Sequence, residues 1–173
     1  DRFLLDELLR ETKASIYCLI REKNNKTAFN KIKNILVLNQ LWKEEYAERI
    51  IPIAGDLSKP EFGLSKSKFE NLCKKIDVIY HNATHMNHLA PYETLKAVNI
   101  TGTIEILKMA CTGKLKPIHY TSTTGVFSEK TTNTPRKINE KTPIDNEIHF
   151  QSSGYSGSKW VAENIIMKAK ERG

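Results

Sequence analysis

The sequence lacks any apolar run long enough to cross a membrane. A transmembrane helix needs roughly 20 consecutive apolar residues, and no segment of the 173 residues approaches that length. The chain as given does not open with a signal-peptide pattern either, which would combine a basic start with a short apolar stretch. We therefore expect no membrane association and a cytoplasmic location.

Cysteine is scarce, and the few cysteines are far apart. The three are Cys18, Cys73 and Cys111. A disulfide framework needs an even number at compact spacing, and a structural zinc site needs closely spaced ligands. Neither pattern is present, so the cysteine usage is typical of a protein from a reducing compartment.

Acidic residues are outnumbered by basic ones, which leaves a formal net charge of +7. Most of the excess is lysine scattered through polar stretches such as 23–33 and 66–75, and aromatic residues that would stack on bases are not interleaved with it. The pattern favours a solvated basic surface over a nucleic-acid site. Some of this charge is also suited to phosphates on a cofactor or to an acidic carrier.

Apolar runs with strand character alternate with segments of helical spacing. The runs that predict strands are 15–21, 49–54, 77–80 and 116–120, and the helical segments include 1–12, 65–75, 92–111 and 155–170. The stretch 128–153 has loop composition. Alternation of this kind predicts an α/β fold with a doubly wound, mostly parallel sheet of the Rossmann type, which binds ligands at the carboxyl ends of its strands.

A glycine-rich turn, which this fold places between its first strand and first helix, is missing. The chain begins on the helix that should follow that strand, and neither Gly125 nor Gly154 replaces the turn. We therefore expect a nucleotide-binding domain that is truncated at both ends.

Tyr155 and Lys159 give the strongest chemical signal. They lie four residues apart on a predicted helix, so the phenol and the ammonium would share one face. A lysine cation beside a phenol favours the phenolate, which suits a tyrosine to donate a proton to a carbonyl oxygen as hydride reaches the carbon. The spacing alone is common by chance, so its neighbours decide its meaning.

A run of hydroxyl residues ends the predicted strand 116–120. The segment reads Tyr120-Thr-Ser-Thr-Thr-Gly-Val-Phe127 and includes Ser122 and Thr123. Hydroxyls at the carboxyl end of a strand can hold a carbonyl oxygen where Tyr155 would protonate it. The alternative is that they only cap the strand end.

Four residues near the ends of the first two strands suit a dinucleotide. Arg21 ends the first predicted strand, where an arginine accommodates the 2′-phosphate of NADP, and Lys31 adds a second positive charge. Gly55-Asp56-Leu57 follows the second strand and would place Asp56 against the adenine. Arg21 can equally be a surface residue, and Asp56 can equally cap the following turn.

His81-Asn82-Ala83-Thr84 follows the third predicted strand, where small residues let the backbone approach a cofactor. His81, His85 and His88 have a spacing that suggests a metal site, but they share no acidic partner and no common helical frame. We therefore interpret them as loop histidines at the entrance of a cofactor or substrate site, and expect no metal.

Together these motifs resemble the thioester reductase family, within the extended short-chain dehydrogenases. In chain order they are Arg21, Gly55-Asp56-Leu57, His81-Asn82-Ala83, Asn99-Ile-Thr-Gly-Thr103, Ser122-Thr123 and Gly154-Tyr155-x-x-x-Lys159-Trp-x-x-Glu163. The family comprises the reductive release domains of nonribosomal peptide and polyketide synthetases, carboxylic acid reductases and aminoadipate reductases. The resemblance implies that 1–173 is a partial NADP-binding reductase domain, without its first strand and glycine-rich loop and without its carboxyl-terminal substrate region.

The resemblance further implies an NADPH-dependent oxidoreductase. It would reduce an acyl or peptidyl thioester, held on the phosphopantetheine arm of a carrier protein, to an aldehyde or alcohol. The implied catalytic residues are Thr123, Tyr155 and Lys159. The implied cofactor-binding residues are Arg21 and Lys31 at the 2′-phosphate, Asp56 and Leu57 at the adenine, Asn82, Ala83 and Thr84 along the channel, and Ser122, Tyr155 and Lys159 near the nicotinamide, with Asn99 bracing the site from its helix.

Two other functions stay open. One is another extended short-chain dehydrogenase, such as a fatty acyl-CoA reductase or a nucleotide-sugar epimerase, which shares the tyrosine and lysine chemistry. The other is a non-catalytic NADP-binding domain, because a fold does not fix a function. The loop Asn87-His88-x-x-Pro91-Tyr92 resembles the thioester reductases more than the sugar-modifying enzymes.

Overall fold

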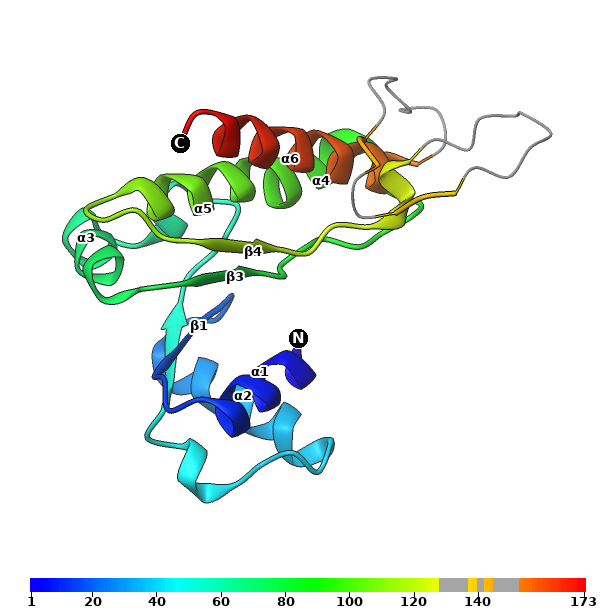
Figure 1. Cartoon of the computed structure of the whole chain (residues 1–173). Coiled ribbons are helices and arrows are strands. Elements are labelled where there is room, and N and C mark those ends of the chain that lie inside the picture. Colours follow the sequence, from blue (N-terminus) through cyan, green and yellow to red (C-terminus); the bar gives the residue numbers. More distant parts are fainter. Residues whose placement is uncertain (128–136, 140–141, 145–152) are drawn as a thin grey trace. The chain divides into compact units, whose positions relative to one another are not determined.

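A computed structural model describes residues 1–127, 137–139, 142–144 and 153–173. The chain divides into two units, Asp1–Ile76 and Asp77–Gly173. In each unit a pair of parallel strands alternates with helices (Figure 1), so the predicted α/β fold with parallel strands is confirmed. Most of the expected loop 128–153 lies outside the described residues.

The first unit follows the predicted order of helix, strand, helix, strand and helix. Its elements are α1 (Arg2–Glu11), β1 (Ile16–Ile20), α2 (Asn25–Leu38), β2 (Ile50–Ala54) and α3 (Lys66–Lys75), with short 3-10 turns at Glu44–Tyr46 and Pro60–Gly63. β1 and β2 pair in parallel, with Ile16 beside Ile50. Their carboxyl ends therefore meet at one edge.

Helix α1 begins with a cap that the sequence motifs did not suggest. The Asp1 carboxylate accepts hydrogen bonds from the backbone N–H groups of Phe3 and Leu4, at 3.0 and 3.3 Å. Helix α2 begins with a capping box, in which Asn24 and Thr27 each accept from the other's backbone N–H. Both caps satisfy donors that a helix leaves free at its first turn.

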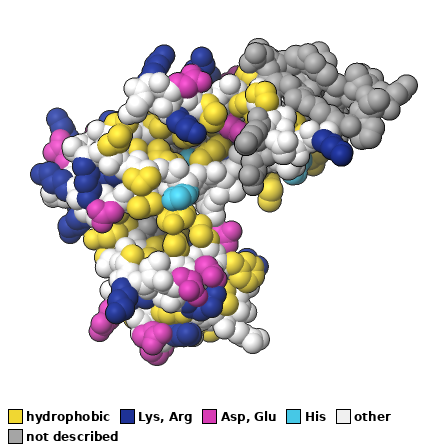
Figure 2. Space-filling model, in the orientation of Figure 1, with side chains coloured by type: hydrophobic (Ala, Val, Ile, Leu, Met, Phe, Trp, Pro, Cys, Tyr) yellow, Lys and Arg dark blue, Asp and Glu magenta, His cyan; other side chains and the backbone are white. Residues whose placement is uncertain are grey.

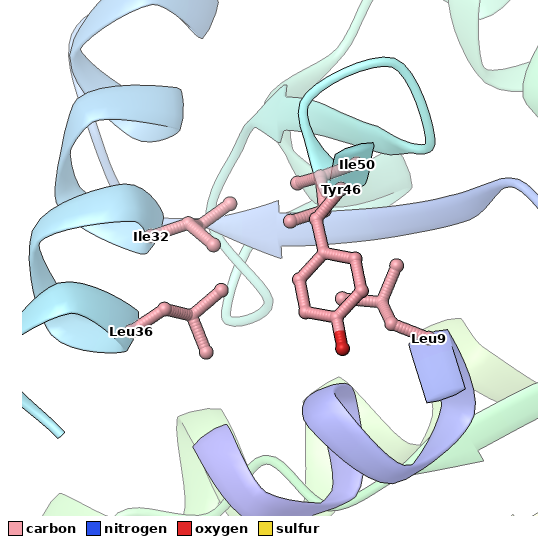
Figure 3. Close-up of a cluster of buried hydrophobic side chains, with 5 residues drawn as sticks. All are labelled: Leu9, Ile32, Leu36, Tyr46 and Ile50. Atoms are coloured by element: carbon pink, nitrogen blue, oxygen red, sulfur yellow. The ribbon is translucent and has the colours of Figure 1, made fainter. Parts of the chain in front are cut away.

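A cluster of buried side chains forms the core of this unit. Figure 3 shows these side chains, contributed by α1, α2, β2 and the 3-10 turn, pointing toward one another. They are Leu9, Ile32, Leu36, Tyr46 and Ile50. Burial of a large apolar side chain contributes about 1.5–3 kcal/mol, so this cluster stabilises the pairing of α1 and α2 with the strands.

The second unit contains the residues expected to carry the chemistry. Its elements are β3 (Ile79–His81), α4 (Tyr92–Lys96), a π-helical turn (Ala97–Thr101), α5 (Gly102–Cys111), β4 (Ile118–Tyr120), a 3-10 turn (Thr124–Val126) and α6 (Gly154–Glu171). β3 and β4 are parallel, with His81 beside Tyr120, and α4, α5 and α6 lie along one side of them (Figure 1).

The helix expected over 92–111 is present, but it is interrupted by the π-helical turn. Residues on both sides of the turn keep right-handed helical dihedral angles, so α4 runs into α5 without a break in the chain direction. Such turns often mark functional positions, because the extra residue re-aims side chains. Here the turn carries Asn99.

Charged side chains of both signs are mixed on the surface. On the face drawn in Figure 2, Lys and Arg side chains occur in several separate groups with acidic side chains among them. In the part of the chain that the structure describes, no helix combines the length and apolar character that spanning a bilayer requires.

Candidate active site

Gly154 allows the start of helix α6 to approach the start of α4 closely. A Cβ on Gly154 would lie 2.6 Å from both the carbonyl oxygen of Ala90 and the amide nitrogen of Tyr92. No other residue type fits this approach without moving backbone. The Ser153 hydroxyl accepts from the N–H of Tyr155 at 3.2 Å, so Tyr155 sits in a first turn that is fixed from two sides.

Lys159 is buried one turn later and faces the end of β4. Its Nζ donates to the carbonyl oxygen of Thr121 at 2.6 Å and lies 4.2 Å from the centre of the Tyr120 ring. Burial lowers the pKa of Lys159 to about 8, against the opposing effect of the Glu163 carboxylate. The lysine therefore combines a positive charge with a proton that it can lose near neutral pH.

Tyr155 lies one turn before Lys159 on α6. It is buried, and its charge is among the causes that raise the pKa of Tyr120 above its ordinary range, after burial and the Glu163 carboxylate. From the loop before α4, the His88 ring meets the Tyr155 ring edge to face, with centroids 5.0 Å apart. The Lys159 ammonium therefore lies at the end of β4, and the Tyr155 ring, one turn earlier on α6, packs against His88.

Each of the first three hydroxyl residues after β4 makes a side-chain hydrogen bond. The Thr121 hydroxyl donates to the Asn82 side-chain oxygen, and the Ser122 hydroxyl donates to the Glu163 carboxylate on α6. Thr123 caps the following 3-10 turn by accepting from the N–H of Gly125 at 3.3 Å. In the described part of the chain, the hydroxyls of Thr123 and Tyr155 are not hydrogen-bonded to each other.

Asn99 connects the loop after β3 with helix α6. Its side-chain oxygen accepts from the Thr84 hydroxyl at 3.1 Å and from the N–H of His85 at 2.7 Å. Its amide nitrogen donates to the carbonyl oxygen of His85 at 3.2 Å and to the Ser158 hydroxyl at 2.9 Å. Ser158 in turn donates to the carbonyl oxygen of Tyr155.

His81 is the last residue of β3 and is buried, so its interpretation as a loop histidine is wrong. The reason is that β3 extends one residue further than the apolar run indicated. The Thr103 hydroxyl donates its proton to the carbonyl oxygen of Asn99 at 2.7 Å, so it accepts from His81 Nε2 at 2.9 Å. Burial, with a smaller effect of the Lys159 cation, lowers the pKa of His81 to about 4.

The other members of the loop motif after β3 are less enclosed. Ala83 and Thr84 are exposed, and Asn82 is partly buried. Among the residues that the structure describes, no group of three or more His, Cys, Asp or Glu side chains is placed to hold a metal ion.

In the first unit, Arg21 and Asp56 follow the carboxyl ends of the paired strands β1 and β2. Arg21 is exposed. Hydrogen bonds from the hydroxyl and N–H of Ser58, at 2.7 and 3.0 Å, lower the pKa of Asp56, and the Arg21 charge adds to the effect. Asp56 therefore does cap the following turn, as one of the two sequence interpretations expects, and Leu57 beside it is buried.

Lys31 is already paired. Its Nζ lies 2.9 Å from the Glu22 carboxylate, in an exposed ion pair. This pairing reduces the charge that Lys31 offers to a phosphate. Of these two cations, Arg21 is therefore the better placed to meet a phosphate.

Three residues contribute to the site without a role assigned from the sequence. Ser158 on α6 accepts a hydrogen bond from Asn99. The Tyr120 ring makes a cation–π contact with the Lys159 ammonium, and the Glu163 carboxylate accepts a hydrogen bond from the Ser122 hydroxyl. The Tyr120 hydroxyl is buried and has no hydrogen-bond partner in the described residues. Only Glu163 had a sequence signal, because it lies one helical turn after Lys159.

Comparison with known proteins places the chain in a family. The family described as Male sterility protein, an NAD(P)-binding family, matches residues 2–173. A linear gramicidin synthase subunit of Brevibacillus parabrevis is 41% identical over 171 residues, covering 99% of this chain and 3% of that protein. The L-2-aminoadipate reductase large subunit of Candida glabrata is 32% identical, covering 99% of this chain and 13% of that protein.

Among solved structures, the terminal R domain from the myxalamid PKS-NRPS biosynthetic pathway is similar throughout. Its sequence is 43% identical and its TM-score is 0.93, covering 99% of this chain and 42% of that one. The chain therefore spans less than half the length of the relatives that it matches. It belongs to the NAD(P)-binding family described as Male sterility protein, within the extended short-chain dehydrogenases.

Proposed function

We propose that the protein containing this chain uses NADPH to reduce an acyl or peptidyl thioester on a carrier protein, releasing an aldehyde or alcohol. The observation that carries the proposal is the placement of Tyr155 and Lys159. They lie one turn apart on α6, and the Lys159 ammonium donates to the backbone at the hydroxyl-bearing end of β4. The similarity to a gramicidin synthase and to a PKS-NRPS R domain supports a carrier-bound thioester as the substrate.

The reaction balances with one hydride and one proton for each two-electron step. The nicotinamide, when bound, supplies hydride to the thioester carbonyl carbon. Tyr155 donates a proton to the carbonyl oxygen, and Thr123 holds that oxygen by a hydrogen bond. The product of this step is a hemithioacetal. Its hydroxyl proton would pass to the sulfur as the carbon–sulfur bond breaks, so that the phosphopantetheine leaves as a thiol and the aldehyde remains. A second hydride and proton give the alcohol.

Lys159 has the donors for two tasks. An ammonium carries three N–H groups, and the structure assigns one of them to the carbonyl oxygen of Thr121. The remaining donors suit the hydroxyls of the nicotinamide ribose. The positive charge, buried beside Tyr155, favours the phenolate that remains after proton transfer.

NADPH in place of NADH is inferred from Arg21. It is exposed at the carboxyl end of β1, where this type of fold presents the adenosine ribose. A guanidinium suits a phosphate because it donates two parallel hydrogen bonds. Lys31 contributes less, since Glu22 already neutralises it.

The remaining cofactor contacts are assigned by position. Asp56 and Leu57 would meet the adenine at the end of β2, and the loop after β3 would line the channel to the nicotinamide. That loop comprises Asn82, Ala83 and Thr84. The side chains of Asn99 and Ser122 are already hydrogen-bonded within the protein. Asn99 would therefore act by holding the loop in place, and Ser122 by its hydrogen bond to Glu163 on α6.

Three substrates distinguish the proposal from its alternatives. The full-length protein is mixed with NADPH and, in separate reactions, an acyl-pantetheine thioester, an acyl-CoA or a UDP-sugar, and the loss of NADPH absorbance is followed. We expect the fastest oxidation with the pantetheine thioester. Faster oxidation with the acyl-CoA would indicate an acyl-CoA reductase. Binding of NADPH with no oxidation of it by either thioester would contradict the proposal.

A further inference from the structure

Two side chains on one face of α6 hold consecutive residues of the strand end. Lys159 donates to the carbonyl oxygen of Thr121 at 2.6 Å, and one turn later Glu163 accepts from the Ser122 hydroxyl. Thr123, the proposed partner of the substrate oxygen, is the next residue along the chain. The two contacts therefore fix the distance between α6 and the segment that precedes Thr123.

Among the residues that the structure describes, Glu163 is the carboxylate whose charge acts on the pKa of Lys159. On β3, Lys159 faces His81, which is neutral because its pKa is lowered to about 4, and on β4 it faces the ring of Tyr120. On its own helix, Tyr155 lies one turn before it and Glu163 one turn after it. A buried ammonium without an opposite charge tends to lose its proton, and Glu163 is the carboxylate placed to oppose that loss.

We propose that Glu163 is a positioning residue of this site: its carboxylate fixes the strand end through Ser122 and supplies the counter-charge that keeps buried Lys159 in its ammonium form. The effect on the reaction rests on the proposed function. The effect on Lys159 does not, because it can be measured in the protein without cofactor or substrate.

Two substitutions separate the effect of the Ser122–Glu163 hydrogen bond from the effect of the Glu163 negative charge. Glu163→Gln retains an oxygen that accepts from Ser122 and removes the negative charge. Ser122→Ala removes the hydrogen bond and leaves the carboxylate in place. If the counter-charge matters to Lys159, only the first substitution should change its titration substantially.

The test is a titration of Lys159 followed by nuclear magnetic resonance. Full-length protein is labelled at lysine Cε, and the Lys159 signal is assigned by its loss in Lys159→Arg. We expect a midpoint near 8 in the wild type, a midpoint lower by about one pH unit in Glu163→Gln, and a midpoint close to the wild type in Ser122→Ala. An unchanged midpoint in Glu163→Gln would overturn the proposal.

A rate profile gives the second measurement. Since the ammonium form is the active one, the rate should fall as pH rises through the pKa of Lys159, and this fall should begin at lower pH in Glu163→Gln. Failure of the wild type to reduce the thioester would contradict the proposed function alone, because the titration still decides the role of Glu163. If Glu163→Gln does not fold, Glu163→Met, which removes the charge and keeps a side chain of similar length, replaces it: a lowered midpoint supports the proposal and an unchanged midpoint overturns it.

Discussion

The side-chain amide of Asn99 donates a hydrogen bond to the Ser158 hydroxyl across 2.9 Å, although the two residues are 59 positions apart in the sequence. The Ser158 hydroxyl in turn donates a hydrogen bond to the backbone carbonyl of Tyr155, in the first turn of α6. The π-helical turn thus positions the helix that carries the tyrosine and the lysine.

Replacing Asn99 should therefore cost more than an ordinary polar substitution. Asn99→Ala removes the donor to the Ser158 hydroxyl, which keeps its own bond to Tyr155, and the acceptor of the His85 N–H. Loss of a partner by a buried polar group costs about 1–3 kcal/mol. We expect a loss of roughly 2–4 kcal/mol in the free energy of unfolding, measured by urea denaturation. The control is Asn87→Ala, which removes two backbone contacts in an exposed loop. Equal losses in both variants would show that Asn99 has no special role.

Arg21→Ala should weaken NADPH binding far more than NADH binding. Hydrogen bonds to a charged group contribute about 1.5–3 kcal/mol, which corresponds to a roughly 10- to 100-fold increase in the Kd for NADPH. Lys31→Ala should have a smaller effect because of its ion pair with Glu22. Both dissociation constants are measured by titration of the cofactor's fluorescence. Equal losses for the two cofactors would mean that Arg21 does not contact the 2′-phosphate.

Gly154→Ala should destabilise the protein and suppress activity together. The three atoms nearest to the added Cβ are backbone atoms of Ala90, Pro91 and Tyr92, so the start of α6 must move, at a cost of about 1–3 kcal/mol. In Gly125→Ala the nearest atom is the Ser156 hydroxyl oxygen at 2.7 Å, which a side-chain rotation can move. Thermal unfolding compares the two variants. A milder effect of Gly154→Ala than of Gly125→Ala would contradict the close approach of α6 and α4.

Buried His81 should make the protein less stable in acid. The pKa of His81 is lowered from 6.5 to about 4 in the folded protein, so on acidification the unfolded chain takes up the proton first. Stability from this group is present above pH 6.5 and is lost as pH falls toward 4, by roughly 3 kcal/mol at most. His81→Gln should flatten this part of the profile of unfolding free energy against pH, and His119→Gln, at an exposed position, should not. Parallel profiles for the wild type and His81→Gln would refute this.

The sequence predicts the strands and the long helices because their signals are local. Apolar runs and helical spacing located β1 to β4 and α6 closely, and α6 contains both Tyr155 and Lys159. The cap at Asp1 was not predicted, because a single aspartate is a weak signal for the start of a helix. His81 was assigned to a loop because a polar residue at a strand end has no apolar signal.

The supporting contacts could not be predicted because they join distant segments. Nothing in the local sequence of Ser122 indicates that its hydroxyl faces Glu163, 41 positions away. The same holds for Asn99 and Ser158. Such pairs become visible only when the packing of α6 against β4 and the π-helical turn is known.

The central claim is that Tyr155 supplies the proton in thioester reduction, and Tyr155→Phe tests it most directly. Phenylalanine retains the ring that packs against His88 and removes only the hydroxyl. Measured with NADPH and an acyl-pantetheine thioester in the full-length protein, kcat should fall by about 100- to 10,000-fold, while the Kd for NADPH stays close to that of the wild type. A variant that reduces the thioester at the wild-type rate would contradict the account.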